Sequence, residues 1–272
     1  MSEQQHGPLG QSSAYPDQYD PKQLYPIPRE LGRSEIGVVE PLPFHGEDIW
    51  NAYELSWLNA KGKPVVAMME MRVPATSPNI VESKSLKLYL GSFNQWVVDS
   101  PEQLQEIIRR DVGETVGAPI SVSLLPLHQL GAFAVQSLPG RCIDDLDVEA
   151  QRYEVDSSLL TVAKGNAREI LHSHLLRSCC PVTGQPDWAS VVIDYEGPQI
   201  NDASLLQYLV SFRNNQEFHE QCVERIFNDI TARCSPQRLS VYARYTRRGG
   251  IDINPYRSTE SISQANVRLV RQ

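Results

Sequence analysis

The sequence predicts an α+β fold made of two similar modules, each with the order strand, strand, helix, helix, strand, strand. The first observation is an internal repeat: "SLKLYLGSFNQ" at 85–95 and "SLLQYLVSFRN" at 204–214 match at six of eleven positions, 119 residues apart. The second is that alternating apolar sequence flanks both copies, which is typical of strands with one buried face. The repeat therefore indicates the architecture before any single element is assigned.

Each copy of the repeat is predicted to form a short amphipathic helix, because its Leu, Tyr and Phe residues recur at spacings of three and four. A second helical pattern follows each copy, at 100–113 and at 215–235. Ser100 and Pro101 stand where an N-cap and a first-turn residue are expected. Two consecutive helices are therefore predicted in each half.

Strands are predicted before and after each helix pair. "PVVAMMEMRV" and "WASVVIDYEG" alternate ahead of the helices, and "PISVSLLPL" and "LSVYARYTRRGG" alternate after them. The first strand of each half is assigned to "DIWNAYELSWL" at 48–58 and "NAREILHSHLLRS" at 166–178. The second of these segments has helical propensity, and the repeat outweighs it.

This pattern divides the chain into three predicted segments, an N-terminal arm and two modules. Residues 1–40 are predicted to be an extended or mobile N-terminal arm, because residues 1–30 are rich in Gln, Ser, Pro, Asp and Tyr and lack apolar periodicity. Folded structure is expected to begin near Phe44. The first module is assigned to 41–150 and the second to 151–272, with the junction near 149–153.

Composition narrows the class of partner. The formal net charge of −8 and the pI near 5.3 argue against a general nucleic-acid or anionic-membrane surface. The sequence has no apolar run of about 18 residues, and residues 1–28 lack the apolar segment of a secretory signal. A small-molecule partner, no membrane and a cytoplasmic location are therefore expected.

The cysteines suggest reduced thiols. The chain has five, an odd number, and no two have a C-x2-C spacing, so neither a disulfide framework nor a zinc ribbon is indicated and no metal site is predicted. Three of them are expected to lie in the core: Cys179, Cys222 and Cys234.

The stretch "SCCPVTGQPDW" at 178–188 is the candidate for chemistry. Pro181 favours an extended Cys180, and the turn residues that follow can fold Asp187 back towards the sulfur. A thiol and a carboxyl group would then reach one small electrophile, although buried cysteines and Pro-Asp turns also occur without catalytic purpose. Cys142, close to Asp144 and Asp145, is the rival thiol, for which a structural place at a strand end is preferred.

Several segments together resemble the NADPH-dependent 7-cyano-7-deazaguanine (preQ0) reductases, the nitrile reductases of queuosine biosynthesis, in their long two-module form. The segments are "LPFHGEDIWNAYELSWLNAKG", "ESKSLKLYLGSFNQ", "CPVTGQPDW", "EFHEQCVERIFND" and "YARYTRRGGIDINPYRS", which extend the match from about residue 40 to the C-terminus. The resemblance implies tandem tunnelling-fold (T-fold) modules, each a ββααββ unit, that associate into a β-barrel. It also implies a homodimer.

The resemblance further implies a reaction. Cys180 would add to the nitrile carbon and form a covalent thioimide, and Asp187 would deliver a proton to the nitrogen. Two NADPH would then supply the four electrons that convert the nitrile to the primary amine of 7-aminomethyl-7-deazaguanine (preQ1), for tRNA modification. Covalent addition suits this chemistry, because it turns a poor hydride acceptor into a more reducible C=N group.

Binding residues are implied in the same way. Glu220 would accept hydrogen bonds from the donor edge of the guanine-like base, with His219 beside the substrate. Residues from the other module would line the substrate as well: Val81, Glu82 and Ser83.

The implied cofactor site is basic. Ser83, Lys84 and, less directly, Lys87 would face NADPH, with Arg248 and Gly249 on its other side. The sequence carries no G-x-G-x-x-G opening a helix after a strand, so a Rossmann domain is not expected. Without the resemblance, these residues would be assigned to an ordinary basic face and a hairpin turn.

Three alternatives stay open on the sequence. One is a noncatalytic purine- or pterin-binding protein of the same fold, with Glu220 as its anchor. Another is a zinc-dependent cyclohydrolase-like enzyme, which the missing Cys/His ligand spacing disfavours. The last is a cysteine hydrolase, which would turn over acyl substrates without NADPH.

Overall fold

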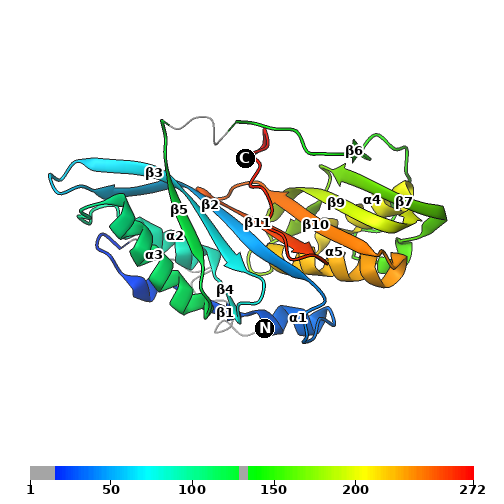
Figure 1. The fold of residues 1–272 in the computed structure, drawn as a ribbon, viewed down its shortest axis with the longest axis horizontal. Helices are drawn as coiled ribbons and strands as arrows, with labels where there is room; N and C mark the ends of the chain where they lie inside the picture. The colour runs from blue at the N-terminus through cyan, green and yellow to red at the C-terminus, as the bar shows by residue number, and fades with distance from the viewer. Residues whose placement is uncertain (1–15, 129–133) are drawn as a thin grey trace. The chain divides into compact units, whose positions relative to one another are not determined.

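The computed structural model describes residues 16–128 and 134–272, which divide into two compact units. We call them the first and the second unit and describe each separately. The first unit comprises Met1–Leu31, Asp48–Ala134 and Arg247–Ile253, and the second comprises Gly32–Glu47, Val135–Thr246 and Asn254–Gln272. Figure 1 shows the helices and strands of both.

The first unit packs two helices on an antiparallel sheet. Strands β2, β3 and β5 are neighbours in that order, and α2 and α3 lie along one face (Figure 1). A small separate sheet pairs β1 with β4. The elements are η2 (Pro21–Gln23), β1 (Pro26–Pro28), β2 (His45–Leu58, in this unit from Asp48), β3 (Pro64–Pro74), β4 (Asn79–Val81), α2 (Ser83–Gly91), α3 (Pro101–Val116) and β5 (Ser121–Pro126).

The second unit repeats this plan with a larger sheet. Its strands follow the order β11, β10, β9, β7 and β6, and β8 also pairs with β9. The elements are β6 (Arg141–Cys142), η4 (Ser157–Leu159), β7 (Val162–Ser173), β8 (Arg177–Cys179), β9 (Pro186–Ile200), α4 (Asp202–Ser211), η5 (Phe212–Asn214), α5 (His219–Cys234), β10 (Arg238–Tyr245) and β11 (Ile251–Ser258, in this unit from Asn254). Helix α1 (Arg29–Glu35) belongs to the first unit up to Leu31 and to the second unit after it.

The helix ends follow from local sequence. Ser100 caps α3 by accepting a hydrogen bond from the Gln103 N–H, with Pro101 as the first helical residue, as predicted. At the other end Gly117 takes the left-handed conformation that terminates the helix, with φ of 73°. Strand β7 forms where helical propensity was high, because it pairs with β9 along its length.

Buried apolar side chains hold helices to sheet in each unit. Strand β3 buries Ala67, Met69, Met71 and Val73 on the predicted face, but Val65 of that face is only half-buried and Met68 of the other face is buried as well. Strand β9 differs from the prediction, because Ser190 and Val192 are buried together with Val191 and Ile193. Each large apolar side chain that becomes fully buried contributes about 1.5–3 kcal/mol.

The sequence repeat corresponds to a repeated hydrogen bond. In the first unit the Tyr89 hydroxyl donates to Asp111 over 2.7 Å, and in the second unit the Tyr208 hydroxyl donates to Asp229 over 2.6 Å. Each bond joins the first helix of the pair to the second. The serine three residues after each tyrosine donates to the tyrosine carbonyl in both units, over 2.6 Å. The identical residues of the repeat therefore serve the same structural purpose twice.

The repeat also reaches into the N-terminal arm. In the first unit, the backbone N–H groups of Asp20 and Tyr25 donate to Ser92, the C-cap of α2, and to Ser85 in its first turn, with η2 between them. Asp156 and Thr161 do the same to serines on α4 in the second unit, on either side of η4. Folded structure thus begins by Tyr19, whose ring stacks on Trp96, rather than near Phe44, and residues 1–15 of the predicted arm lie outside the described residues.

The predicted final strand of the first half is a second correction. After β5, the described residues form only the two-residue β6 before the second half begins, and β6 pairs with β7. The second half does have two strands after its helices, β10 and β11. The order strand, strand, helix, helix, strand, strand therefore holds only in the second half, where the short β8 is inserted between the first two strands.

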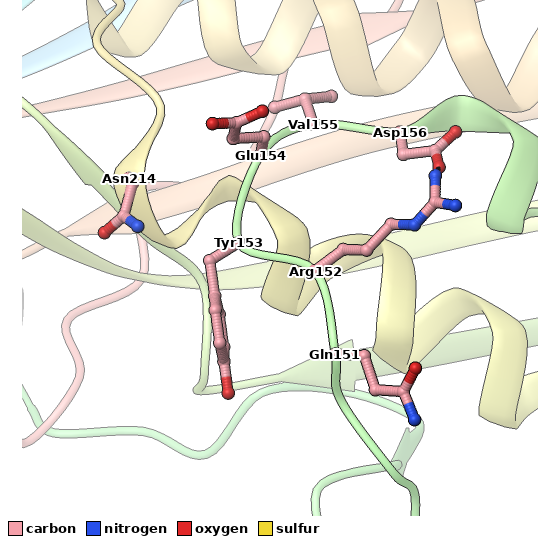
Figure 2. Close-up of a pocket in the computed structure, with 7 residues that line it drawn as sticks. All are labelled: Gln151, Arg152, Tyr153, Glu154, Val155, Asp156 and Asn214. Carbon is pink, nitrogen blue, oxygen red and sulfur yellow. Dashed lines mark hydrogen bonds and ion pairs between the residues drawn. The ribbon is translucent and has the colours of Figure 1, made fainter.

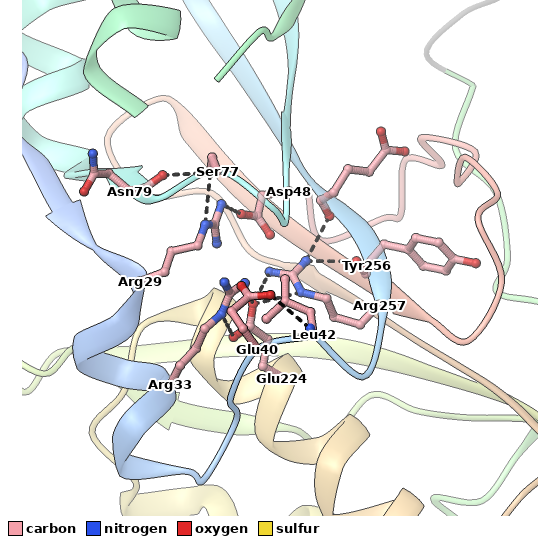
Figure 3. Close-up of polar contacts among 11 residues, drawn as sticks. Arg29, Arg33, Glu40, Leu42, Asp48, Ser77, Asn79, Glu224, Tyr256 and Arg257 are labelled. Carbon is pink, nitrogen blue, oxygen red and sulfur yellow. Dashed lines mark hydrogen bonds and ion pairs between the residues drawn. The ribbon is translucent and has the colours of Figure 1, made fainter. Parts of the chain in front are cut away.

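Buried ion pairs anchor the segments near α1 (Figure 3). In the first unit Arg29 pairs with Asp48 at 2.5 Å. In the second unit Glu224 accepts from both Arg33 and Arg257, each at 2.8 Å, and all three are at most 9% exposed. In the described part of the chain, no helix has the length and apolar character needed to cross a membrane.

Candidate active site

A tight hairpin positions Cys180 and Asp187 in the second unit. Strand β8 pairs with β9 so that Ser178 faces Asp187, and the Cys180 N–H donates to the Gln185 carbonyl over 2.8 Å. Gly184 closes the turn with φ of 66°. Because cross-strand partners and residues two apart in a strand share a face, this register places Cys180, which directly follows β8, on the same side of the hairpin as Asp187.

Asp187 is in turn next to a stacked pair of rings. The Oδ2 atom of Asp187 lies 3.5 Å from Nε2 of His219, and Asp187 is 4% exposed. The His219 imidazole stacks on the Tyr245 ring with centroids 3.7 Å apart. Burial raises the pKa of the Tyr245 phenol well above its usual value, so this ring is neutral at any working pH.

One buried polar atom of this group, His219 Nδ1, makes no hydrogen bond within the described residues, whereas Ser178 Oγ and Tyr245 Oη lie within hydrogen-bonding reach of the Cys222 thiol. Buried polar atoms usually have partners, and each that lacks one costs about 1–3 kcal/mol. A polar ligand with matching donors and acceptors would recover part of this cost. The cluster thus has the chemical character of a binding site.

Glu220 follows His219 in the first turn of α5 and is 4% exposed. A carboxylate in this position is favoured by the partial positive charge at a helix N-terminus. Its burial beside His219 makes it a candidate for recognising a neutral base with N–H donors. The structure thus groups four predicted residues in one unit: Cys180, Asp187, His219 and Glu220.

The other thiols are less suited to attack. All five cysteines are free, and burial raises the pKa of the Cys222 and Cys234 thiols, which keeps them protonated. Cys142 lies in β6 at a strand end, as predicted, and partial burial raises its pKa as well. Cys179 is buried with its sulfur 3.8 Å from the Arg213 carbonyl.

The remaining predicted residues belong to the first unit, where two of them have structural contacts. Val81 is part of the hydrophobic core, and its strand pairs with β1 of the arm. Glu82 is the N-cap of α2 and accepts from the N–H groups of Lys84 and Ser85, both at 2.7 Å. Burial outweighs these bonds and raises the pKa of Glu82. Ser83 and Lys84 are half-buried in the first turn of α2.

A glycine turn lies against Lys87 in the same unit. Gly249 and Gly250 have φ of 58° and 76°, and the Arg248 N–H bonds the Ile251 carbonyl across them. A Cβ atom on Gly249 would come within 3.2 to 3.4 Å of the end of the Lys87 side chain. The turn and α2 thus bring Gly249 beside a lysine amine, a combination that fits the phosphate groups of a dinucleotide.

One pocket of the second unit is lined by other residues. It has a volume of about 620 Å³ and is formed by residues 151–156 and Asn214 (Figure 2). Arg152 turns back to pair with Asp156 beside it. None of the predicted site residues lines this pocket.

One cluster of possible metal ligands could not be recognised from sequence spacing, because the folded sheet brings its members together. Cys142, His172 and His174 each place a ligand atom within 4.8 Å of the others. His172 and His174 follow Cys142 by 30 and 32 positions, so no metal-binding spacing was visible. The H-x-H pattern in a predicted strand was the one available signal, because residues two apart share a face.

Comparison with known proteins gives a consistent result over the whole chain. A family model described as nitrile reductase, 7-cyano-7-deazaguanine-reductase N-term, matches residues 15–124, and one described as QueF-like protein matches 186–264. A protein of Burkholderia multivorans named NADPH-dependent 7-cyano-7-deazaguanine reductase is 55% identical over 98% of this chain and 99% of its own. This chain belongs to that reductase family.

Further relatives of the family carry the same name. The protein of Dechloromonas aromatica is 55% identical over 97% of this chain and 95% of its own length. Among solved structures, the archaeosine synthase QueF-Like in the apo form aligns with 35% of this chain and 94% of its own, at 15% identity and a TM-score of 0.31.

Proposed function

We propose that this protein reduces the nitrile of 7-cyano-7-deazaguanine to the primary amine of 7-aminomethyl-7-deazaguanine with two NADPH, as a step in making queuosine for tRNA. Its family membership and the names of its relatives support the reaction. The hairpin that turns Cys180 and Asp187 to one face is the structural observation that carries it.

Cys180 is the nucleophile in this proposal. Its sulfur adds to the nitrile carbon, and the C≡N bond becomes the C=N bond of a thioimide. Asp187, on the same face of the hairpin, gives the nitrogen the proton it needs as negative charge develops. His219 lies 3.5 Å from Asp187 and supplies a second group through which that proton can be restored.

Substrate binding is assigned to buried polar groups. Glu220 accepts hydrogen bonds from the N–H donors of the base, and His219 lies beside the ring. Val81, Glu82 and Ser83 also remain assigned to substrate. Because the Glu82 carboxylate caps α2, its backbone or a shift of its side chain would have to make that contact.

The cofactor residues are Ser83, Lys84, Lys87, Arg248 and Gly249. Lysine and arginine would bind the phosphates, and Gly249 leaves space at the Lys87 side chain. NADPH supplies hydride when bound, two equivalents for the four-electron reduction. The chain's own contribution is to hold the thioimide carbon, exclude water and provide protons.

The proposal includes finer features of the architecture. It places two T-fold modules in tandem, at 41–150 and 151–272, in a cytoplasmic homodimer. The Tyr–Asp hydrogen bond that recurs in both helix pairs supports the tandem arrangement. Native mass spectrometry of the full chain would detect the dimer, and a single mass of one chain would refute it.

The test combines two measurements on the full chain. NADPH oxidation is followed with and without 7-cyano-7-deazaguanine, and intact-protein mass spectrometry is run with the substrate alone. The wild type is expected to form an adduct and to oxidise NADPH, and Cys180→Ala is expected to do neither. Cys179→Ser is the matched control, since it changes the adjacent thiol and should keep both signals.

The substitution Asp187→Asn distinguishes binding of the nitrile substrate from its chemical conversion. The amide has nearly the same shape but cannot donate a carboxylic proton, so turnover is expected to fall by about 10²–10⁴-fold while the ligand still binds. Binding without any adduct or oxidation in the wild type would indicate a noncatalytic binding protein instead.

A further inference from the structure

A second cluster of reactive side chains lies on the outer edge of the second unit's sheet. Strand β6 runs parallel to β7 with Cys142 opposite His172, and His174 follows directly after the end of β7, with its ring 5.3 Å from that of His172. Each of the three offers a ligand atom within 4.8 Å of the others. All three are exposed or half-exposed, so an ion can reach them from solvent.

The hydrogen bonds of the two imidazoles leave one nitrogen of each for a ligand. His172 Nδ1 lies 2.9 Å from the Pro139 carbonyl, which can only accept, so Nδ1 carries the proton and Nε2 keeps its lone pair. His174 Nδ1 lies 2.8 Å from Ser190 Oγ. That oxygen also accepts from Arg271 and has a second lone pair for His174. Metal-binding histidines are commonly oriented by such bonds.

The carboxylate of Asp144 lies beside these three side chains. Asp144 Oδ2 accepts from the His174 backbone N–H over 2.9 Å, and the Asp144 carboxylate also lies within hydrogen-bonding reach of the Cys142 thiol. Beside a thiol and two imidazoles, this carboxylate is suited to bind a cation directly or through water.

We propose that Cys142, His172 and His174 bind a zinc ion, with Asp144 or a water molecule in the fourth position. One sulfur and two imidazole nitrogens favour zinc over magnesium or calcium, which prefer oxygen. Bonds of about 2.0–2.3 Å place the ligand atoms of tetrahedral zinc roughly 3.3–3.8 Å apart, so small side-chain rotations close the site. The charge of Arg271 opposes binding, and the Cys142 thiolate and Asp144 offset it.

The ion would fasten the short strand β6 to β7. Strand β6 is only two residues long, and its register pairs with β7 are Arg141 with Leu171 and Cys142 with His172. A metal that joins both strands adds a link that the unfolded chain lacks, so it stabilises the folded state. This site is separate from the reaction assigned to Cys180.

The experiment is a titration of the full, metal-depleted chain with Zn²⁺ and with Co²⁺. We expect one Zn²⁺ per chain, a higher Tm in its presence, and a thiolate-to-cobalt charge-transfer band. Cys142→Ser should lose the band and weaken Zn²⁺ binding by at least about 100-fold, because the thiolate is the strongest ligand. His172→Ala and His174→Ala should each weaken binding by about 10- to 100-fold.

Two controls decide between this site and others. His128→Ala removes an exposed histidine outside the cluster and should change nothing. Cys180→Ala should keep the band, since the band belongs to Cys142. A band that survives Cys142→Ser, or wild-type binding no tighter than that of Cys142→Ser, would overturn the proposal.

Discussion

The imidazole of His219 lies flat on the ring of Tyr245, with centroids 3.7 Å apart and planes inclined by 2°. The stack fixes the histidine ring while its Nε2 is 3.5 Å from Asp187. Burial keeps Tyr245 neutral, so the ring serves as a surface and its hydroxyl is not an acid or base at working pH.

The stacked rings predict that two substitutions of Tyr245 have different effects on activity. Tyr245→Phe keeps the ring and should retain most of kcat/KM for the nitrile. Tyr245→Leu removes the ring, and because aromatic pairs are worth about 0.5–1.5 kcal/mol, kcat/KM should fall by up to about 10-fold. Steady-state kinetics on folded variants measures both, and equal losses in the two would contradict the positioning role.

Gly249→Ala should weaken NADPH binding. The new Cβ would meet the Lys87 side chain at 3.2–3.4 Å and force it to shift. We expect KM for NADPH to rise several-fold, while the adduct at Cys180 with substrate alone is unchanged. Gly62→Ala is the matched control, because Gly62 also has positive φ, 72°, but faces open space. A similar change of KM in both variants would remove the argument for a cofactor contact.

Glu224→Gln should destabilise the protein. Glu224 neutralises part of the charge of Arg33 and of the fully buried Arg257, and removing one partner of such a buried group costs about 3–5 kcal/mol. Urea denaturation gives the free energy of unfolding. Glu106→Gln breaks an exposed pair with Arg109 and should cost less than about 1 kcal/mol, so similar losses for the two substitutions would refute the prediction.

The buried carboxyl group of Glu82 predicts that the free energy of unfolding depends on pH. Burial raises its pKa above the usual 4.5, so the folded chain holds a proton that the unfolded chain releases. The stability linked to this proton is present below pH 4.5 and is lost as the pH rises through the folded pKa. The free energy of unfolding of wild type relative to Glu82→Gln should therefore decrease from about pH 4 upward, as urea titrations at several pH values can show. A flat difference would show that the carboxyl group titrates normally.

Much of the fold could be predicted from the sequence because the internal repeat outweighed ambiguous local helix and strand patterns. The assignment of 166–178 as strand-forming is the clearest case: β7 covers most of it, and helical propensity alone would have been misleading. The final strand of the first half was wrong, because alternation in "PISVSLLPL" supports only β5. The arm was also misjudged, since the backbone bonds that dock Asp20 and Tyr25 on α2 leave no apolar pattern in the sequence.

The candidate site was predictable in part. The turn residues around Gly184 indicated that Asp187 folds back towards Cys180, and the hairpin has that form. The ring stack needs Tyr245, 26 residues from His219, and sequence spacing does not reveal such pairs. Cys142 with His172 and His174 was invisible for the same reason, because a parallel strand pairing brings them together.

The Tyr–Asp hydrogen bond occurs once in each helix pair, so the two copies of the repeat share the same internal brace. At the offset of 119 residues, Lys61 and Met68 stand where the second copy has Cys180 and Asp187. Disrupting Tyr89 or Tyr208 should weaken folding alike, whereas the reactive groups exist in one copy alone.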